Sequence, residues 1–396
     1  MTGFSVRNQA AIAGYAHSPI MRRSPLSLGA LAMRTVREAI SDAGLELSDI
    51  DGFVTSPMFP SLGSHTSMEG ISVVPTNWLA QRLGVSPRYQ ENTQEQLPGA
   101  ISTAVNAIHA GAADCIVVFR ALHNPGGSYH ENLSSEARGR EQWGMPQGHF
   151  GPICAIALAY NEYAQRYGAD ENALAHIGIE SRKNGARLAG SFWQDKPLDM
   201  AGYLDAPLIN DPIRMLDCDI PVDGVAAFIL TSAERARDMP NPPVYVSAFT
   251  EMLPLRRRIA SHWPYDDIME LGEICVERLL KRGGISLSEI DYPQVYDGFS
   301  PLALFWMELL DVCPRGEAHR LIASGGIDSD DPQAAPVLAS GGSLGNGRMH
   351  GTPQMLECYL QLAQRAGSRQ REVSRALACQ GLPHAGGMVL YSSEPY

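Results

Sequence analysis

The sequence predicts an α/β protein built from two similar halves. Residues 31–51 read LAMRTVREAISDAGLELSDID, and residues 271–291 read LGEICVERLLKRGGISLSEID. The two segments align without a gap and share Leu, Val, Gly, Leu, Ser, Ile and Asp at matching places. The chain is also 44% hydrophobic and only 19% charged, which is typical of a compact α/β enzyme. Internal similarity of this kind predicts a duplicated unit.

Each copy of the repeat has the pattern of a helix followed by a turn and a strand. Apolar residues recur at three- and four-residue steps, which predicts an amphipathic helix. A glycine then ends the helix, and an LSxID turn leads to a short apolar segment. We expect strands at residues 52–56 and 292–300.

The joint between the halves is expected at ARDMPNPPVYVSAF, residues 236–249, where prolines precede a new strand. This gives an N-terminal half at 1–240, with a loop insertion at about 123–215, and a C-terminal half at 241–396. Further elements follow the same α/β plan. They are a helix and an apolar strand within 100–122, a helix at 351–367 and a final strand at 386–394.

Composition excludes several classes of function. A net charge of −12 argues against a nucleic-acid partner, which would require basic faces. No apolar run reaches the length of a membrane span, and the N-terminus lacks the pattern of a signal peptide. Seven scattered cysteines without CxxC spacing predict reduced thiols in a cytoplasmic protein and no metal site in this chain.

The most unusual stretch is ASGGSLGNGRMHGTPQM, residues 339–355, where five glycines surround Asn346, Arg348 and His350. It precedes a predicted helix, and the segment VYDGFSP at 295–301 also lies where a strand gives way to a helix. Ligands of α/β sheets bind at such strand ends. The two segments are therefore expected to line one site.

These motifs together resemble the thiolase superfamily, in particular its sterol-carrier-protein-x and lipid-transfer-protein branch. DCDIPVDGVAAFILTSAERARD resembles the CxPxDGAAA signature of that branch, and GGSLGNGRMHG occupies the place of the GGxxxxGHPxGATG loop. YDGFSPLALFWMELLDVCPRGEAHRLIASGGI is similar to the HDCFS signature. The resemblance covers nearly the whole chain and implies the duplicated thiolase fold, with αβαβα layers.

The departures from the thiolases concern the catalytic residues. The place of the nucleophilic cysteine falls near Gln94, and no cysteine occurs between Met1 and Cys115. An amide cannot carry an acyl group, because that step requires a thiolate. Arg348 stands in place of the histidine of the thiolase loop, and Tyr296 stands in place of the histidine of HDCFS.

Within this branch, the sequence most resembles the bacterial steroid side-chain aldolases that lack the cysteine. YDGFSP is close to their YDHFTP, AADCIVVFRALHN to their VADVVVAYRAFN, and GGSLGNGRMHGT to their GGQLGEAYIHGM. The resemblance implies retro-aldol cleavage of a β-hydroxyacyl-CoA, with CoA as part of the substrate and no bound cofactor. It also implies a homodimer that binds a separate OB-fold/zinc-ribbon subunit to give a heterotetramer. Of the two tyrosines considered catalytic in that group, one matches Tyr296 and the other falls on Arg348.

A retro-aldol step needs a proton acceptor for the β-hydroxyl and a donor for the enolate that forms on the thioester. Tyr296 is the candidate for the proton acceptor or donor, with its pKa lowered by a nearby cation. Arg348 is the candidate for that cation, or for a contact with the thioester oxygen or the CoA phosphates. His350 is the candidate for a proton relay or an enolate hydrogen bond. Each of the three also has a purely structural interpretation.

The residues expected to line the substrate site are Gly341, Gly342, Asn346, Gly347, Asp297, Gln94 and His149. The alternative role of Asp297 is to cap a helix. Two other functions remain open at this stage. One is a thiolase-like acyltransferase that uses Cys379, and the other is a non-catalytic subunit that binds acyl-CoA or lipid.

Overall fold

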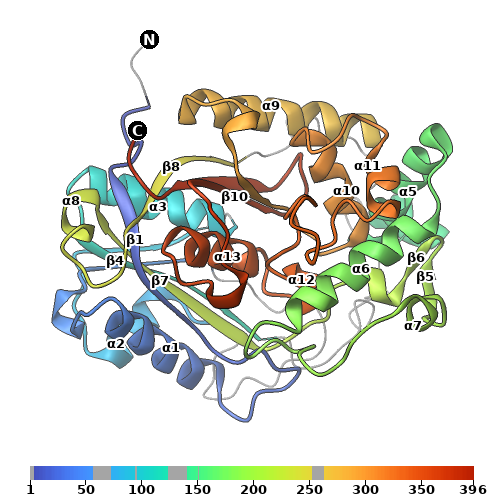
Figure 1. The fold of residues 1–396 in the computed structure, drawn as a ribbon. Helices are drawn as coiled ribbons and strands as arrows, with labels where there is room; N and C mark the ends of the chain where they lie inside the picture. Colours follow the sequence, from blue (N-terminus) through green and yellow to red (C-terminus); the bar gives the residue numbers. More distant parts are fainter. Residues whose placement is uncertain (1–3, 57–72, 94–95, 124–140, 150, 252–262) are drawn as a thin grey trace.

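The structure is a computed structural model that describes residues 4–56, 73–93, 96–123, 141–149, 151–251 and 263–396 (Figure 1). In the first half the elements are β1 (Ala10–His17), α1 (Leu28–Asp42), β2 (Gly52–Thr55), α2 (Thr76–Leu83), β3 (Tyr89–Asn92), α3 (Leu97–His109), β4 (Cys115–Leu122) and β7 (Gly224–Ser232). The short helix α8 (Ala233–Ala236) ends the first half. In the second half the elements are β8 (Val244–Glu251), α9 (Tyr265–Gly283), β9 (Tyr292–Gln294), α10 (Ser300–Leu309), α11 (Ala318–Ala323), α12 (Gly342–Asn346), α13 (Thr352–Leu362), β10 (Arg375–Gln380) and β11 (Gly387–Ser392).

The region predicted as a loop insertion is largely helical where the structure describes it. It contains α4 (Glu141–Gly144), α5 (Gly151–Tyr167), α6 (Glu171–Gly185), α7 (Met200–Leu204) and a hairpin of β5 (Leu208–Asn210) and β6 (Ile213–Arg214). The core packing explains the difference, because α5 and α6 bury apolar residues against the second half of the chain. Residues 124–140 of the expected loop insertion lie outside the described part.

The predicted repeat is present as structure. After α1, a short 3₁₀ turn at Leu47–Asp49 with a capping box leads to β2, and after α9 the turn at Leu287–Glu289 with its own capping box leads to β9. The predicted strand at 292–300 is shorter than expected, since β9 ends at Gln294. The chain beyond it leaves the sheet, and this is where Tyr296 lies.

Nine strands of the described chain form one sheet in the order β3-β2-β4-β7-β1-β8-β11-β10-β9. The halves join where β1 pairs antiparallel with β8, through Ala11 with Tyr245 and Ile12 with Val244. β2, β4, β7 and β1 of one half correspond in order to β9, β10, β11 and β8 of the other.

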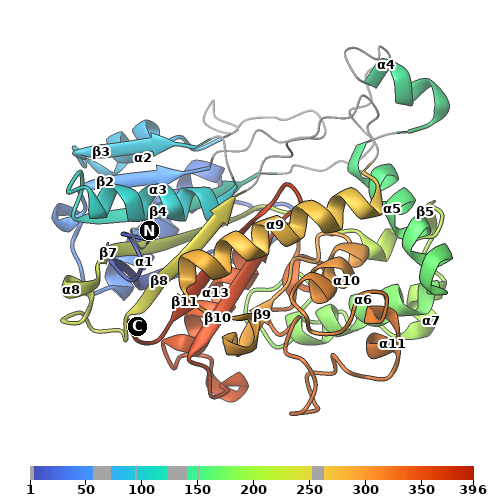
Figure 2. The ribbon, with the colours of Figure 1, turned by 90° about the horizontal axis from the view of Figure 1, so that it is seen from above.

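Alternate side chains of the strands point to different helical layers, as the two-residue period of a strand requires. One set packs with α3 and α13 in a shared central cluster, which includes Ile116, Val118, Ala376 and Ala378. The other set packs outward, against α1 and α2 in the first half and against α9 and α10 in the second. Figures 1 and 2 show α3 and α13 close to both halves of the sheet, which gives the layered α/β architecture expected from the sequence.

Two sequence-based expectations concern composition. All seven cysteines are free thiols. Within the described residues, no helix combines the length and the apolar character that crossing a membrane would require.

Candidate active site

The glycine-rich stretch forms α12 and the turn that links it to α13, and Asp297 holds it in place. The Asp297 carboxylate accepts hydrogen bonds from the backbone N–H groups of Ser343 at 2.6 Å and Leu344 at 3.3 Å. Ser181 Oγ donates to it at 2.9 Å and Gln354 Nε2 at 3.2 Å. Burial raises the pKa of Asp297 to about 6, against the lowering effect of these hydrogen bonds. Asp297 therefore acts as the cap of α12.

The same contact explains one of the glycines. Gly342 has a φ of +54°, and a Cβ atom built there would lie 2.1 Å from both Asp297 carboxylate oxygens. Both the backbone conformation and the space therefore require glycine at this position. The sequence suggested that Gly342 lines the substrate site. In the structure, the direction in which a side chain would extend from Gly342 is occupied by the buried carboxylate of Asp297.

Other glycines of the turn allow close packing between helices. A Cβ on Gly345 would lie 1.9 Å from the Ser181 carbonyl oxygen in α6, and one on Gly341 would lie 2.6 Å from Gly185. A Cβ on Gly347 would meet Val222 at 2.7 Å. The turn is thus pressed against α6 and the segment before β7, so its backbone position is fixed on several sides.

Asn346 also contributes to the turn. It is buried, and its Nδ2 donates to the carbonyl oxygens of Ser340 and Gly342, both at 2.8 Å. A role of Asn346 or of the glycines in substrate binding stays a prediction.

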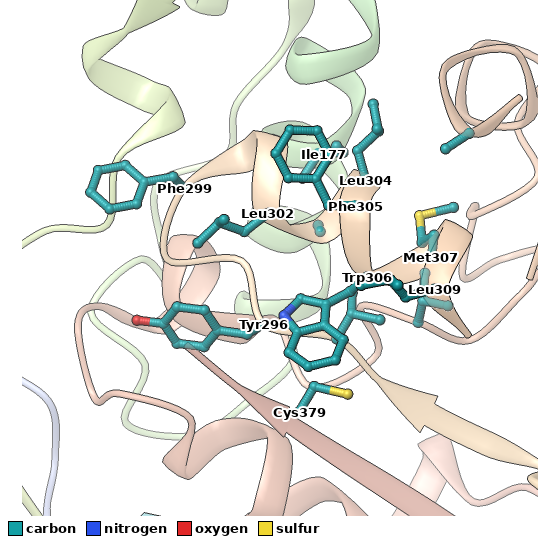
Figure 3. Close-up of a cluster of buried hydrophobic side chains, with 14 of the residues drawn as sticks. Ile177, Tyr296, Phe299, Leu302, Leu304, Phe305, Trp306, Met307, Leu309 and Cys379 are labelled. Atoms are coloured by element: carbon teal, nitrogen blue, oxygen red, sulfur yellow. The ribbon is translucent and has the colours of Figure 1, made fainter. Parts of the chain in front are cut away.

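Tyr296 lies in the irregular segment between β9 and α10 and is 9% exposed. Its ring packs at the edge of the large apolar cluster of the second half. Trp306 and Cys379 belong to the same cluster, and Figure 3 shows the Tyr296 hydroxyl pointing away from both. The hydroxyl folds back over Gly298, where an added Cβ would lie 2.5 Å from it. It is also within electrostatic range of Arg348, as expected.

The expected pKa shift of Tyr296 is wrong in direction. Burial is the largest influence and raises the pKa of the phenol above its usual value of 10, and Asp219 raises it further, while Arg348 lowers it by less. Removal of a phenolate from water destabilises it more than one nearby cation stabilises it. Tyr296 therefore holds its proton at neutral pH, and its hydroxyl can donate a hydrogen bond.

Arg348 and His350 occupy the turn between α12 and α13. Arg348 Nε lies 2.7 Å from His350 Nε2, and its backbone N–H donates to the Ile220 carbonyl oxygen at 2.8 Å. On the other side of the imidazole, Arg120 Nη2 lies 2.8 Å from His350 Nδ1. His350 thus stands between two guanidinium groups from distant parts of the chain.

The charge of His350 follows from this arrangement. Burial, Arg348 and Arg120 together lower the pKa of His350 well below 6.5, so the ring is neutral at pH 7. Guanidinium groups only donate hydrogen bonds, and a neutral imidazole has a single acceptor nitrogen. The cluster is rich in donors and suits a ligand oxygen that carries negative charge.

Arg120 belongs to this site and was not singled out from the sequence. It lies in β4, is 1% exposed, and donates through Nη1 to Ser56 Oγ at 3.1 Å. Burial lowers the pKa of Arg120 to about 10, so it remains charged at neutral pH. The signal that would have revealed it is a lone arginine within the apolar strand CIVVFRAL.

Asp219 is the second residue that the sequence reasoning missed. It is 3% exposed, and its backbone N–H donates to the Gly298 carbonyl oxygen at 3.1 Å. Burial raises the pKa of Asp219 to about 7, and Arg348 lowers it by less. The available signal was the group of three aspartates in DCDIPVDG, of which Asp219 is the middle one.

Three other expected residues have separate outcomes. Gln94 lies outside the described residues. His149 lies on the partly exposed segment between α4 and α5, and its backbone N–H donates to the Gly144 carbonyl oxygen at 3.1 Å. Cys379, in β10, is fully buried, and burial raises its pKa well above 9, which disfavours the thiolate that an acyltransferase needs.

Within the described residues, no group of three or more potential metal ligands occurs.

Comparisons with known proteins agree with this fold. Residues 272–393 match the family described as thiolase C-terminal domain-like. The chain is 28% identical over 390 residues to the steroid side-chain-cleaving aldolase of Thermomonospora curvata, across 95% of this chain and 96% of that protein. It is 27% identical over 364 residues to the 17-hydroxy-3-oxo-4-pregnene-20-carboxyl-CoA lyase of Mycobacterium tuberculosis, across 89% and 91% of the two chains.

A solved structure of the Ltp2-ChsH2(DUF35) aldolase superposes with a TM-score of 0.83 and 25% identity, covering 98% of both chains. Fold, site and comparisons define a thiolase-fold protein of the sterol-carrier-protein-x and lipid-transfer-protein branch. Within that branch the chain is a carbon–carbon lyase of the aldolase type, as the sequence predicted.

Proposed function

We propose that this chain cleaves a β-hydroxyacyl-CoA by a retro-aldol reaction, and that the acyl group is a steroid side chain or a related thioester. The observation that carries the proposal is the cluster in which His350 lies between the guanidinium groups of Arg348 and the buried Arg120, within electrostatic range of a protonated Tyr296. The names of the two relatives, which refer to a steroid side chain and to a pregnene carboxyl-CoA, support the substrate class.

The reaction places negative charge on the thioester oxygen, and the cluster supplies donors for it. When the bond between the α and β carbons breaks, its electron pair forms an enolate of the shortened acyl-CoA. Arg120 and Arg348 stabilise the enolate oxygen, because buried, fixed charges act more strongly than charges in water. His350, held neutral with its ring nitrogens facing the two guanidinium groups, orients the arginines.

Tyr296 is the proton donor of this scheme. Its phenol gives a proton to the α carbon of the enolate, and the β carbon becomes the carbonyl of the released ketone or aldehyde. No acyl-enzyme is formed, and neither a metal nor a further cofactor takes part, since CoA enters as part of the substrate.

The experiment is incubation of the protein with β-hydroxyacyl-CoA thioesters, with products identified by mass spectrometry. We expect a shortened acyl-CoA and a matching ketone or aldehyde in equal amounts. Tyr296→Phe should abolish both products while circular dichroism and thermal stability remain those of a folded protein. Full activity of this variant would refute the role of the phenol, and binding without any product would favour a carrier function.

The quaternary structure belongs to the same proposal. We infer that the chain forms a homodimer and binds a separate OB-fold/zinc-ribbon subunit, giving a heterotetramer. The name of the structural neighbour, which pairs an aldolase with a DUF35 protein, supports such a partner. The free thiols and the acidic composition agree with a cytoplasmic location.

A further inference from the structure

The proposed reaction needs a proton acceptor for the β-hydroxyl, and neither Tyr296 nor His350 is suited to it. The phenol of Tyr296 already holds its proton at neutral pH. His350 has its two ring nitrogens facing Arg348 and Arg120, and its pKa lies well below 6.5. An imidazole of such low basicity between two cations is a poor proton acceptor.

Asp219 is an acidic group that lies within electrostatic range of both the Tyr296 phenol and Arg348. Its backbone N–H donates to the Gly298 carbonyl oxygen at 3.1 Å, and the Tyr296 hydroxyl folds over that same glycine. The next residue, Ile220, accepts the backbone N–H of Arg348 at 2.8 Å. One short segment therefore joins the tyrosine and the arginine, and Asp219 lies at the junction.

We propose that Asp219 is the proton acceptor of the reaction and that Arg348 fixes its carboxylate at the site. This inference rests on the proposed retro-aldol function and assigns the half of the reaction that the other residues leave open. Asp219 takes the proton of the β-hydroxyl, the carbon–carbon bond breaks, and Tyr296 protonates the α carbon. The proton on Asp219 then passes to the Tyr296 phenolate, which restores both groups for the next cycle.

The surroundings of Asp219 make its titration suitable for this task. The charged and titratable groups that act on it are Arg348 on the glycine-rich turn and Asp297 next to Tyr296, with Arg120 beyond them on β4. Burial and Asp297 favour the neutral acid, and Arg348 favours the carboxylate. The pKa of about 7 that results is close to the optimum for a base that works at neutral pH.

Asp217 offers a matched control on the same segment. It too is fully buried, and burial raises its pKa to about 6. Its carboxylate, however, accepts hydrogen bonds from Tyr203 Oη and from the backbone N–H of Arg214, both at 2.8 Å. These partners lie on α7 and β6 and not in the Arg348 cluster, so Asp217 has a structural role.

The test measures kcat against pH for the wild-type protein, Asp219→Asn and Asp217→Asn, with the β-hydroxyacyl-CoA that the wild type cleaves. We expect a wild-type profile that rises through neutral pH. Asp219→Asn should lower kcat by about 100-fold or more and remove the rising limb. Asp217→Asn should keep the rising limb at its wild-type position.

Two further variants address folding and position. In Asp219→Ala, added formate should restore part of the activity, which a structural defect would not allow. Asp219→Glu should keep the rising limb with a reduced kcat. Two results for Asp219→Asn would overturn the role of Asp219 as proton acceptor and leave the retro-aldol function intact. One is a wild-type kcat, and the other is a reduced kcat whose rise with pH is unchanged. Absence of cleavage by the wild type would overturn both.

Discussion

Replacing Gly342 by alanine tests whether the turn that carries Arg348 is fixed by the protein itself. The new Cβ would lie 2.1 Å from the Asp297 carboxylate oxygens, closer than real Cβ contacts allow. The carboxylate is buried and held by several hydrogen bonds, so it cannot move without losing them. Either the turn shifts or Asp297 does, and both changes displace the site.

The cost has three parts. The left-handed backbone at φ +54° costs an alanine about 1 to 2 kcal/mol, and overpacking adds about 1 to 3 kcal/mol. A buried carboxylate that loses a hydrogen bond adds about 1 to 3 kcal/mol. We therefore expect Gly342→Ala to lower the free energy of unfolding by about 3 to 8 kcal/mol. With an unfolding entropy of about 2.1 cal/mol/K for each of 396 residues, the melting temperature should fall by about 4 to 10 °C.

Gly84→Ala is the matched control. Gly84 ends α2 with a φ of +74°, but a Cβ there meets no atom within 4 Å. Only the backbone strain destabilises this variant, so its melting temperature should fall by about 1 to 2 °C. Differential scanning calorimetry of the two variants and the wild type gives the comparison. Equal losses for both variants would refute the contact with Asp297, and the glycine would then have to be explained by a ligand.

Two further predictions concern other buried groups. Cys379→Ala should keep the wild-type cleavage rate, and intact-protein mass spectrometry should detect no acylated chain in either protein, because the buried thiol stays protonated. An acylated wild-type chain would revive the acyltransferase alternative. The pKa of Asp219, raised from 3.8 to about 7, contributes stability that is full below pH 4 and is lost as the pH rises to 7. Asp219→Asn has no carboxyl group to titrate at this position. Its free energy of unfolding, measured with urea, should therefore rise by about 2 kcal/mol relative to that of the wild type between pH 5 and pH 8. A difference between the two proteins that does not change with pH would contradict the raised pKa of Asp219.

The duplication and its elements could be predicted from the sequence because they depend on local patterns. The helix-turn-strand repeat is carried by apolar spacing, a glycine after the helix and a capping turn, and all of these lie within about twenty residues. The helices α5 and α6 were missed, although each has apolar residues at helical spacing. These helices pack against α9, α10 and α12, which lie far from them in the sequence, and a local pattern does not reveal such contacts.

The candidate site shows a different limit. Tyr296, Arg348 and His350 were found because they stand in motifs, and Tyr296 and Arg348 interact in the structure as expected. The direction of the Tyr296 pKa shift was missed because burial is a property of the folded chain, and desolvation outweighs one nearby cation. Arg120 was missed because its strand looks like an ordinary buried strand and its partners come from residues 56 and 350.

The glycine-rich turn shows why a motif and its mechanism should be separated. The glycines suggested a backbone that approaches a ligand, yet those at 341, 342 and 345 are required by α6 and Asp297 of the same chain. A turn that is packed so tightly cannot move freely, and it therefore holds Arg348 and His350 in a fixed position. Fixed donors cost little reorganisation when charge develops on a substrate oxygen, which is the condition for strong electrostatic stabilisation. In the proposed reaction, the glycines therefore contribute by making the protein rigid at the point where the two guanidinium groups face the same imidazole.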